Sequence, residues 1–129
     1  MSSWYLDTSA LLKLVVSEKE SAALRKVVGD NEVTSNFTRL EVARTLKPYS
    51  AKAKKDAGAL LNSISLIPVD SEIMTQAELI IEVSESKAAD AIHVASAMRL
   101  GTLIEGIITY DNQMAVAASR LGIQVIAPD

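Results

Sequence analysis

The sequence predicts an α/β fold, a three-layer α/β/α sandwich with a short central parallel sheet. Short apolar runs alternate with segments of helical period from one end of the chain to the other. Strands that alternate with helices form parallel sheets covered on both faces, because each helix carries the chain back to the same edge of the sheet. The chain has no repeat or linker, and its 129 residues are typical of one domain, so we expect a single domain over residues 1–129.

The first half of the chain is expected to hold three short strands and four helices. An apolar run that stops at Asp7 favours a first strand, and Gly29-Asp30 closes the second helix. The third helix is expected to stop before Pro48, because proline is excluded from helix interiors. The expected strands are residues 4–6, 33–35 and 64–69. The expected helices are residues 10–16, 21–28, 39–47 and 50–62.

Two runs of apolar residues at helical spacing predict two further helices in the second half. The first run is Ile73, Ala77, Ile80 and Ile81. The second run is Ala88, Ala91, Ile92, Ala95 and Met98, with Gly101 at its end. A strand at residues 106–109, a helix at 112–121 closed by Gly122 and a last strand at 124–126 complete the pattern.

The composition excludes several kinds of site. The chain has no cysteine, so it can form neither disulfides nor a thiolate zinc site. Its one histidine, His93, excludes a zinc or iron centre built from several histidines. The composition does not exclude a site at which carboxylates bind a hard cation.

Charge and hydropathy bear on partners and location. The net charge is −3, which argues mildly against a nucleic-acid substrate unless clustered acids hold a cation. Apolar residues make up 49% of the chain, and this high fraction suggests surface that a partner covers. The N-terminus has no basic segment followed by a long apolar stretch, so we expect a cytoplasmic protein that does not span a membrane.

Two acids stand at the ends of expected strands. Asp7 stands after the first strand and Asp111 stands soon after the strand at 106–109, each just before a helix. Ligands of parallel sheets bind outside the carboxyl ends of the strands, which favours a functional role. An N-cap of the following helix explains each residue equally well.

Two further acids lie on expected helices. Glu41 ends Thr38-Arg-Leu-Glu41, which matches a capping box at a helix start, and that structural interpretation is the stronger one. Asp90 lies among small apolar residues, a turn inside its helix, where capping does not explain it. Because it flanks an apolar stripe, we expect it to be partly buried and to need a partner such as a metal ion.

Together the four acids indicate one metal site. Two of them share the carboxyl edge of the sheet, and the topology can bring the other two to it. Four carboxylates in one cleft repel each other, and Mg²⁺ would relieve that repulsion, bind phosphate and activate water. His93 is expected to hydrogen-bond locally near the cleft rather than bind metal. Side chains expected to orient the carboxylates or metal waters are Thr8, Ser9, Thr109 and Asn112, although helix capping also explains the hydroxyls.

A basic segment lies close to Glu41 in the sequence. It contains Arg39, Arg44, Lys47, Lys52, Lys54 and Lys55. Such runs are commonly solvated helix faces, but Arg39, Arg44 and Lys47 are candidates for contacting RNA phosphates or an acidic partner.

The segments that carry the acids resemble a known family. They are YLDTSALLKL at 5–14, TRLEVAR at 38–44, ADAIHVASA at 89–97 and TYDNQMAVAA at 109–118, with LGIQVIAP closing the chain at 121–128. In this order and spacing they resemble PIN-domain nucleases, specifically the VapC toxins of type II toxin–antitoxin pairs. The resemblance runs from about Tyr5 to Pro128, nearly the whole chain.

This resemblance implies a Mg²⁺- or Mn²⁺-dependent endoribonuclease that forms a homodimer. It implies that Asp7 and Asp90 are the best metal ligands and that Glu41 and Asp111 complete the catalytic cluster and help position the attacking water. It also implies inhibition by a cognate antitoxin, whose C-terminal segment would lie across apolar grooves and block the acidic site.

One departure from the family concerns the number of ions. Many relatives carry a further acid shortly after the position of Asp111, whereas Asn112 and Gln113 stand here. We therefore expect one resident ion, with a second arriving only with the RNA phosphate.

Two alternatives remain. A phosphatase of the haloacid dehalogenase type would use Asp7 as nucleophile, but it needs Asp-x-Asp after the first strand and Ser9 replaces the second acid. A catalytically inactive PIN fold could serve as an RNA- or protein-binding module, although all four acids are present.

Overall fold

The computed structural model describes residues 3–129 and contains one five-stranded sheet. All neighbouring strands are parallel, and their order across the sheet is β3-β2-β1-β4-β5. The predicted parallel sheet is therefore confirmed. The strands are β1 (Trp4–Leu6), β2 (Val33–Ser35), β3 (Ser65–Ile67), β4 (Gly106–Ile108) and β5 (Val125–Ile126).

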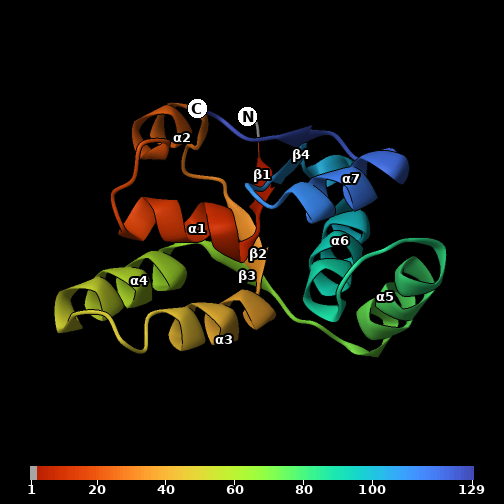
Figure 1. Cartoon of the computed structure of the whole chain (residues 1–129), viewed down its shortest axis with the longest axis horizontal. Coiled ribbons are helices and arrows are strands. Elements are labelled where there is room, and N and C mark those ends of the chain that lie inside the picture. Colours follow the sequence, from red (N-terminus) through yellow and green to blue (C-terminus); the bar gives the residue numbers. More distant parts are fainter. Residues whose placement is uncertain (1–2) are drawn as a thin grey trace.

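Helices cover both faces of this sheet, as predicted. Figure 1 shows α1 to α4 on one side of the strands and α5 to α7 on the other. The first group is α1 (Thr8–Val15), α2 (Ser21–Val27), α3 (Asn36–Thr45) and α4 (Ala51–Ser63). The second group is α5 (Ser71–Val83), α6 (Ala88–Leu100) and α7 (Asn112–Arg120), with the short 3₁₀ helix η1 (Gly101–Leu103) after α6. Within residues 3–129, no helix is both long and apolar enough to cross a membrane.

The core is divided by the sheet, because successive side chains of a strand point to opposite faces. Tyr5 packs with α5, α6 and α7, whereas Leu6 packs with Ala10 and Leu24 on the other side. Helix α6 is the central helix of its layer, and every residue from 90 to 97 on it is buried. Polar groups on α6 therefore have to find partners inside the protein.

Two element boundaries differ from the predicted ones and one agrees, each for a physical reason. Helix α3 begins at Asn36 rather than at residue 39, because Ser35, in extended conformation at the end of β2, is already its N-cap residue. Strand β3 ends at Ile67, directly before Pro68, which has no N–H for the ladder. Helix α6 ends at Gly101 as predicted, and the φ of 53° at this residue favours glycine.

Candidate functional site

The candidate site lies where β1 and β4 end side by side. The chain runs outward from β1 to β2 and β3 and then returns to the other side of β1 with β4, so this pair forms the topological switch point of the sheet. Leu6 pairs with Ile108 at the ends of the two strands. Asp7 and Thr109 follow them directly and are therefore neighbours.

Asp7 is the most enclosed of the four predicted acids, at 2% exposure. Its Oδ1 accepts hydrogen bonds from the Ala10 amide at 2.9 Å and from the Ser9 hydroxyl at 2.7 Å. Its Oδ2 accepts one from the Thr109 hydroxyl at 2.5 Å. Burial raises the pKa of Asp7 although these three hydrogen bonds oppose it. The N-cap interpretation is thus confirmed, and it leaves a fixed carboxylate at the switch point.

Asp90 is predicted to be partly buried, and it is 6% exposed. The expectation that it lies a turn inside its helix is wrong. Helix α6 begins at Ala88 after the cap residue Lys87, so Asp90 stands in the first turn, where the helix dipole favours an acid. Its buried Oδ2 has no hydrogen-bond partner among the described residues. Burial raises its pKa, and the charge of Asp111 raises it further.

Asp111 caps α7, as the alternative interpretation predicts. Its Oδ1 accepts from the amides of Gln113 at 2.9 Å and Met114 at 3.1 Å. Its own amide donates to the Thr109 hydroxyl at 3.0 Å. Thr109 therefore connects the acid that ends β1 with the loop that carries Asp111, and it fixes both positions relative to the sheet.

The capping box predicted for Glu41 is wrong, because Thr38 is already inside α3 and hydrogen-bonds to Thr34 at 2.6 Å. Glu41 Oε1 instead accepts a hydrogen bond of 2.6 Å from His93 Nε2 and one of 2.5 Å from the Thr8 hydroxyl. Burial raises the pKa of Glu41, but these two bonds outweigh it and leave the pKa below its usual value. Glu41 therefore carries its charge at neutral pH.

His93 is 1% exposed and forms the centre of a buried polar chain, in line with the expected local hydrogen bonding. Its Nδ1 lies 2.7 Å from the Tyr5 hydroxyl, and its Nε2 faces Glu41. The rings of Tyr5 and Phe37 pack against the imidazole at centroid distances of 5.8 and 5.7 Å. Sequence reasoning missed the role of Tyr5, whose place in a short apolar strand suggests only core packing.

The hydroxyl groups predicted to orient the carboxylates contact them. Thr8 donates to Glu41, and both Ser9 and Thr109 donate to Asp7. Asn112 is exposed at the first position of α7 and lines a neighbouring pocket.

The donors suit a hard cation chemically, because they are carboxylate oxygens and because one of them, the buried Asp90 Oδ2, has no hydrogen-bond partner in the part of the chain from residue 3 to residue 129. Asp7 and Asp111 both influence the pKa of Asp90, so the three acids share one electrostatic environment. Across residues 3–129, however, no three acidic or histidine side chains stand close enough to enclose a metal ion. The acidic side chains would therefore have to move before they could enclose a cation, and Glu41 is bound to His93.

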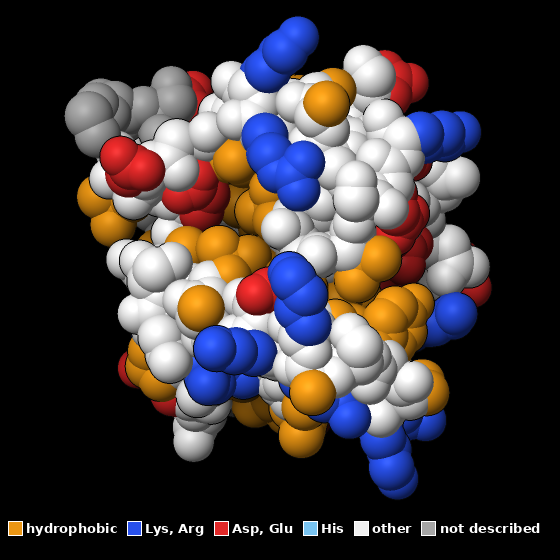
Figure 2. Space-filling view, turned by 90° about the vertical axis from the view of Figure 1, so that its left-hand side faces the viewer, with side chains coloured by type: hydrophobic (Ala, Val, Ile, Leu, Met, Phe, Trp, Pro, Cys, Tyr) orange, Lys and Arg blue, Asp and Glu red, His pale blue; other side chains and the backbone are white. Residues whose placement is uncertain are grey.

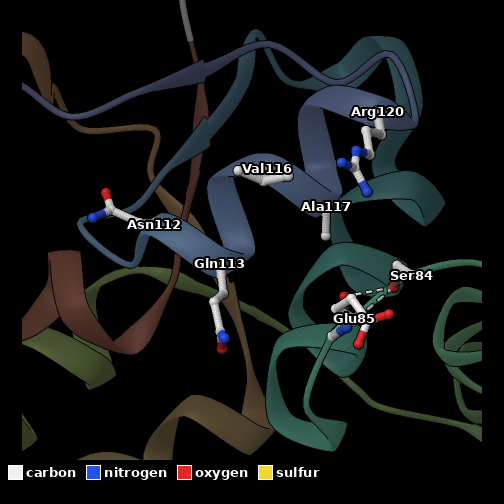
Figure 3. A pocket seen from close by; sticks show the side chains of 8 residues that line it. Ser84, Glu85, Asn112, Gln113, Val116, Ala117 and Arg120 are labelled. Carbon is white, nitrogen blue, oxygen red and sulfur yellow. Dashed lines mark hydrogen bonds between the residues drawn. The ribbon is translucent and has the colours of Figure 1, made fainter.

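A pocket of about 280 Å³ lies along α7, and its lining begins at Asn112, the residue that follows Asp111 in the sequence. Figure 3 shows Gln113, Val116 and Ala117 along α7 and Ser84 and Glu85 on the segment before α6. Its walls are mainly apolar, and Arg120, Asn112 and Gln113 are among the polar residues that line it.

Three of the predicted basic residues, Arg39, Arg44 and Lys47, lie on or next to α3, the helix that also carries Glu41, whereas Lys52, Lys54 and Lys55 lie on α4. Arg39, Arg44 and Lys47 are exposed, and Arg39 hydrogen-bonds to Asn62 of α4 at 3.2 Å. Figure 2 shows this side of the molecule, where Lys and Arg side chains are scattered between hydrophobic patches. The arrangement is a mixed surface rather than a continuous basic groove.

The chain is similar to a known family along most of its length. A sequence model of the PIN domain matches residues 4–119. Ribonuclease VapC46 of Mycobacterium tuberculosis (strain ATCC 25618 / H37Rv) is 39% identical over 130 residues, which cover 99% of each chain. Ribonuclease VapC35 of the same strain is 32% identical, with 96% of each chain covered.

Solved structures share the fold. A toxin–antitoxin complex from Klebsiella pneumoniae contains a chain that matches with a TM-score of 0.77 at 22% identity, covering 98% of both chains. VapC20 of Mycobacterium tuberculosis, described as a sarcin–ricin loop cleaving toxin, matches with a TM-score of 0.75 at 18% identity, covering 98% of this chain and all of the other.

Proposed function

The chain belongs to the PIN domain family, and on that basis we propose that it is a VapC-type ribonuclease, the toxin of a toxin–antitoxin pair, which cleaves RNA internally. One observation carries the proposal. A chain similar over nearly its whole length to VapC ribonucleases has a buried carboxylate, Asp7, at the switch point of its sheet, and a second buried carboxylate, Asp90, close enough for Asp7 to raise its pKa. The switch point is the place where parallel sheets bind ligands.

A divalent cation, Mg²⁺ or Mn²⁺, is part of this proposal. Asp7, Asp90 and Asp111 would hold it, with Glu41 beside them, because oxygen-only donors suit these ions. The unpartnered Oδ2 of Asp90 supports the assignment, since a buried carboxylate oxygen needs a compensating partner. When bound, the cation would supply positive charge for the phosphate and activate a water molecule.

The protein's own groups would fix the geometry. Ser9 and Thr109 hold Asp7, and the helix amides of α7 hold Asp111, so two carboxylates are oriented before RNA binds. Glu41 keeps its charge at neutral pH and would accept a hydrogen bond from the attacking water. Preorganised groups of this kind lower the barrier because they need not reorient during the reaction.

Arg39, Arg44 and Lys47 would bind phosphates of the RNA backbone. Their exposure and their place on or next to the helix of Glu41 support this role. Replacing any one of them by a neutral residue should make RNA binding less dependent on salt concentration, because fewer counterions are then released from the RNA.

We also propose a homodimer and a cognate antitoxin as partners. Met74 and Ile81 are exposed apolar side chains seven positions apart on one flank of α5, and they are a candidate dimer face. A groove of about 340 Å³ between α3 and α4 has an apolar floor that includes Val42, Leu46 and Leu61, and it is a candidate for the antitoxin segment. Related folds solved as toxin–antitoxin complexes support an antitoxin partner.

The decisive experiment is cleavage of a mixed RNA pool by purified protein with Mg²⁺, with a chelator, and with Asp90→Asn. A matched control is Asp56→Asn, which removes an acid that pairs with Lys52 on the surface of α4. Discrete cuts should disappear with the chelator and with Asp90→Asn but persist in the control. Cutting that survives Asp90→Asn would overturn the site, and the absence of any cutting would favour the binding-module alternative.

A further inference from the structure

We propose that His93 is a positioning residue for Glu41. Its Nε2–H holds one oxygen of the carboxylate, and the Tyr5 hydroxyl fixes the imidazole tautomer that makes this bond possible. The inference rests on the proposed ribonuclease function of Glu41 and deepens it, because it assigns a role to two buried residues outside the acidic set.

The geometry forms a continuous chain across three elements. Tyr5 on β1 lies 2.7 Å from Nδ1 of His93 on α6, and Nε2 of the same ring lies 2.6 Å from Oε1 of Glu41 on α3. Tyr5 is fully buried, and its hydroxyl, which has one proton to donate, lies closer to His93 Nδ1 than to the Ser35 hydroxyl at 3.2 Å. The chain therefore runs from the core to the half-buried carboxylate at the edge of the site.

The direction of each hydrogen bond follows from the donors available. A carboxylate only accepts, so Nε2 has to carry the proton that faces Glu41. In a neutral imidazole Nδ1 is then bare and needs a donor, which the Tyr5 hydroxyl supplies. Burial raises the pKa of Tyr5 to about 12, so this hydroxyl keeps its proton at neutral pH. In the imidazolium form Nε2 also donates, so the bond to Glu41 does not depend on the charge of the ring.

Both hydrogen bonds that hold the Glu41 carboxylate are made to one of its two oxygens. The Thr8 hydroxyl donates to the same Oε1 that His93 contacts. Oε2 is left for water or RNA, and the two bonds determine where it points. Phe37 and Tyr5 pack on the imidazole and limit its rotation, so the orientation is transmitted from the core. Outer hydrogen bonds of this kind commonly set the orientation of metal-site ligands.

The first test is the tautomer of His93 in the metal-free protein. His93 is the only histidine, so its ring ¹⁵N signals need no assignment. The expected result is a protonated Nε2 and an unprotonated Nδ1 in the neutral ring, with less of this tautomer in Tyr5→Phe. A dominant Nδ1–H tautomer in the wild type would overturn the proposal. This measurement needs neither RNA nor metal, so it is decided separately from the ribonuclease activity.

The second test compares His93→Leu with His93→Gln, whose side-chain amide can again donate toward Glu41. His93→Leu should slow single-turnover cleavage of the RNA pool by about 10- to 100-fold, as for other outer groups that orient a site carboxylate. His93→Gln should recover most of the loss. Equal losses in both variants, or no loss in either, would overturn the positioning role.

Two further variants keep the test decisive. Ile92→Val removes a methylene beside His93 in the core and should lower stability without changing the tautomer or cleavage. Tyr5→Phe keeps its ring and should slow cleavage by about 2- to 10-fold, the value of one hydrogen bond. Wild-type cleavage in Tyr5→Phe would count against the proposal even if His93→Leu does not fold. If the wild type cuts no RNA, the proposed function fails while the tautomer result still stands.

Discussion

The Thr109 hydroxyl donates a 2.5 Å hydrogen bond to Oδ2 of Asp7, so the residues that follow two neighbouring strands are tied together. Because Leu6 pairs with Ile108, the residues that follow them, Asp7 and Thr109, lie next to each other. Thr109 Oγ1 also accepts from the Asp111 amide at 3.0 Å. The Thr109 hydroxyl therefore links two of the proposed catalytic acids, Asp7 and Asp111, at the end of β4.

Thr109→Val should weaken both the fold and the site. Valine keeps the shape of the side chain but leaves a buried carboxylate oxygen and the Asp111 amide without this partner. The expected loss of unfolding free energy is about 1–3 kcal/mol, with slower RNA cleavage. Urea denaturation and RNA-pool cleavage measure the two effects. Thr109→Ser keeps the hydroxyl and is the matched control, and equal losses in both variants would show that packing rather than hydrogen bonding matters here.

Asp7→Asn should stabilise the metal-free protein at neutral pH. Burial raises the folded-state pKa of Asp7 above its ordinary value of 3.8, so the folded protein binds this proton more tightly than the unfolded chain does. The unfolding free energy therefore falls as the pH rises from 3.8 through the folded pKa, and the penalty is fully present above it. Removing the charge should recover about 1–3 kcal/mol at neutral pH, a typical cost of an incompletely compensated polar group.

The pH dependence checks this prediction. Denaturant unfolding between mildly acidic and neutral pH should show a shallower loss of stability in Asp7→Asn than in the wild type. Asp90 contributes in the same direction, because its pKa is also raised, so some slope should remain. A variant that is less stable than the wild type at neutral pH would contradict the prediction and would make the carboxylate of Asp7 a net stabilising group.

Mg²⁺ or Mn²⁺ should raise the melting temperature of the wild type. A cation among Asp7, Asp90 and Asp111 relieves their repulsion, and ligand binding stabilises the folded state by about 2.7 kcal/mol at roughly 100 times the dissociation constant. Asp90→Asn should abolish most of this response, whereas Asp56→Asn should keep it. Differential scanning fluorimetry over a metal titration measures the effect. A wild type that does not respond to millimolar metal would contradict a binding site made of these acids.

The sequence predicts the acids at strand ends well, because topology alone determines their place. Asp7 and Asp111 each follow a short apolar run and precede a helix, and parallel strands align such residues at one edge. The predicted bounds of strands β1 and β2 also agree with the structure to the residue. Patterns within a few neighbouring residues carry this information.

The contacts of Glu41 could not be predicted in this way. A local motif, Thr38 to Glu41, suggests a capping box, but the helix starts at Asn36 because Ser35 already serves as its cap. The real partner, His93, lies 52 positions further along the chain, and Tyr5 lies 88 positions before His93. Only packing of α3 and α6 around the sheet brings these groups together, and no periodicity in one segment encodes that packing.

Gly106→Ala should destabilise the protein strongly because β4 and β5 approach closely at this residue. A Cβ at Gly106 would overlap the backbone carbonyl oxygen of Gln124, which accepts a hydrogen bond of 2.9 Å from the Ile107 amide. The strands would have to separate, so we expect a loss of about 2–4 kcal/mol in unfolding free energy. Because β4 places Thr109 beside Asp7, cleavage of RNA should fall as well.

Gly58→Ala is the matched control for this change. Gly58 lies inside α4, and a Cβ there meets nothing within 4 Å among the described residues. Alanine favours the helix and restricts the unfolded chain, so this variant should gain about 0.4–1 kcal/mol. Urea denaturation of both variants separates the two causes. If both alanines cost similar free energy, general intolerance of larger side chains rather than the close approach of β4 to Gln124 would explain the loss at Gly106.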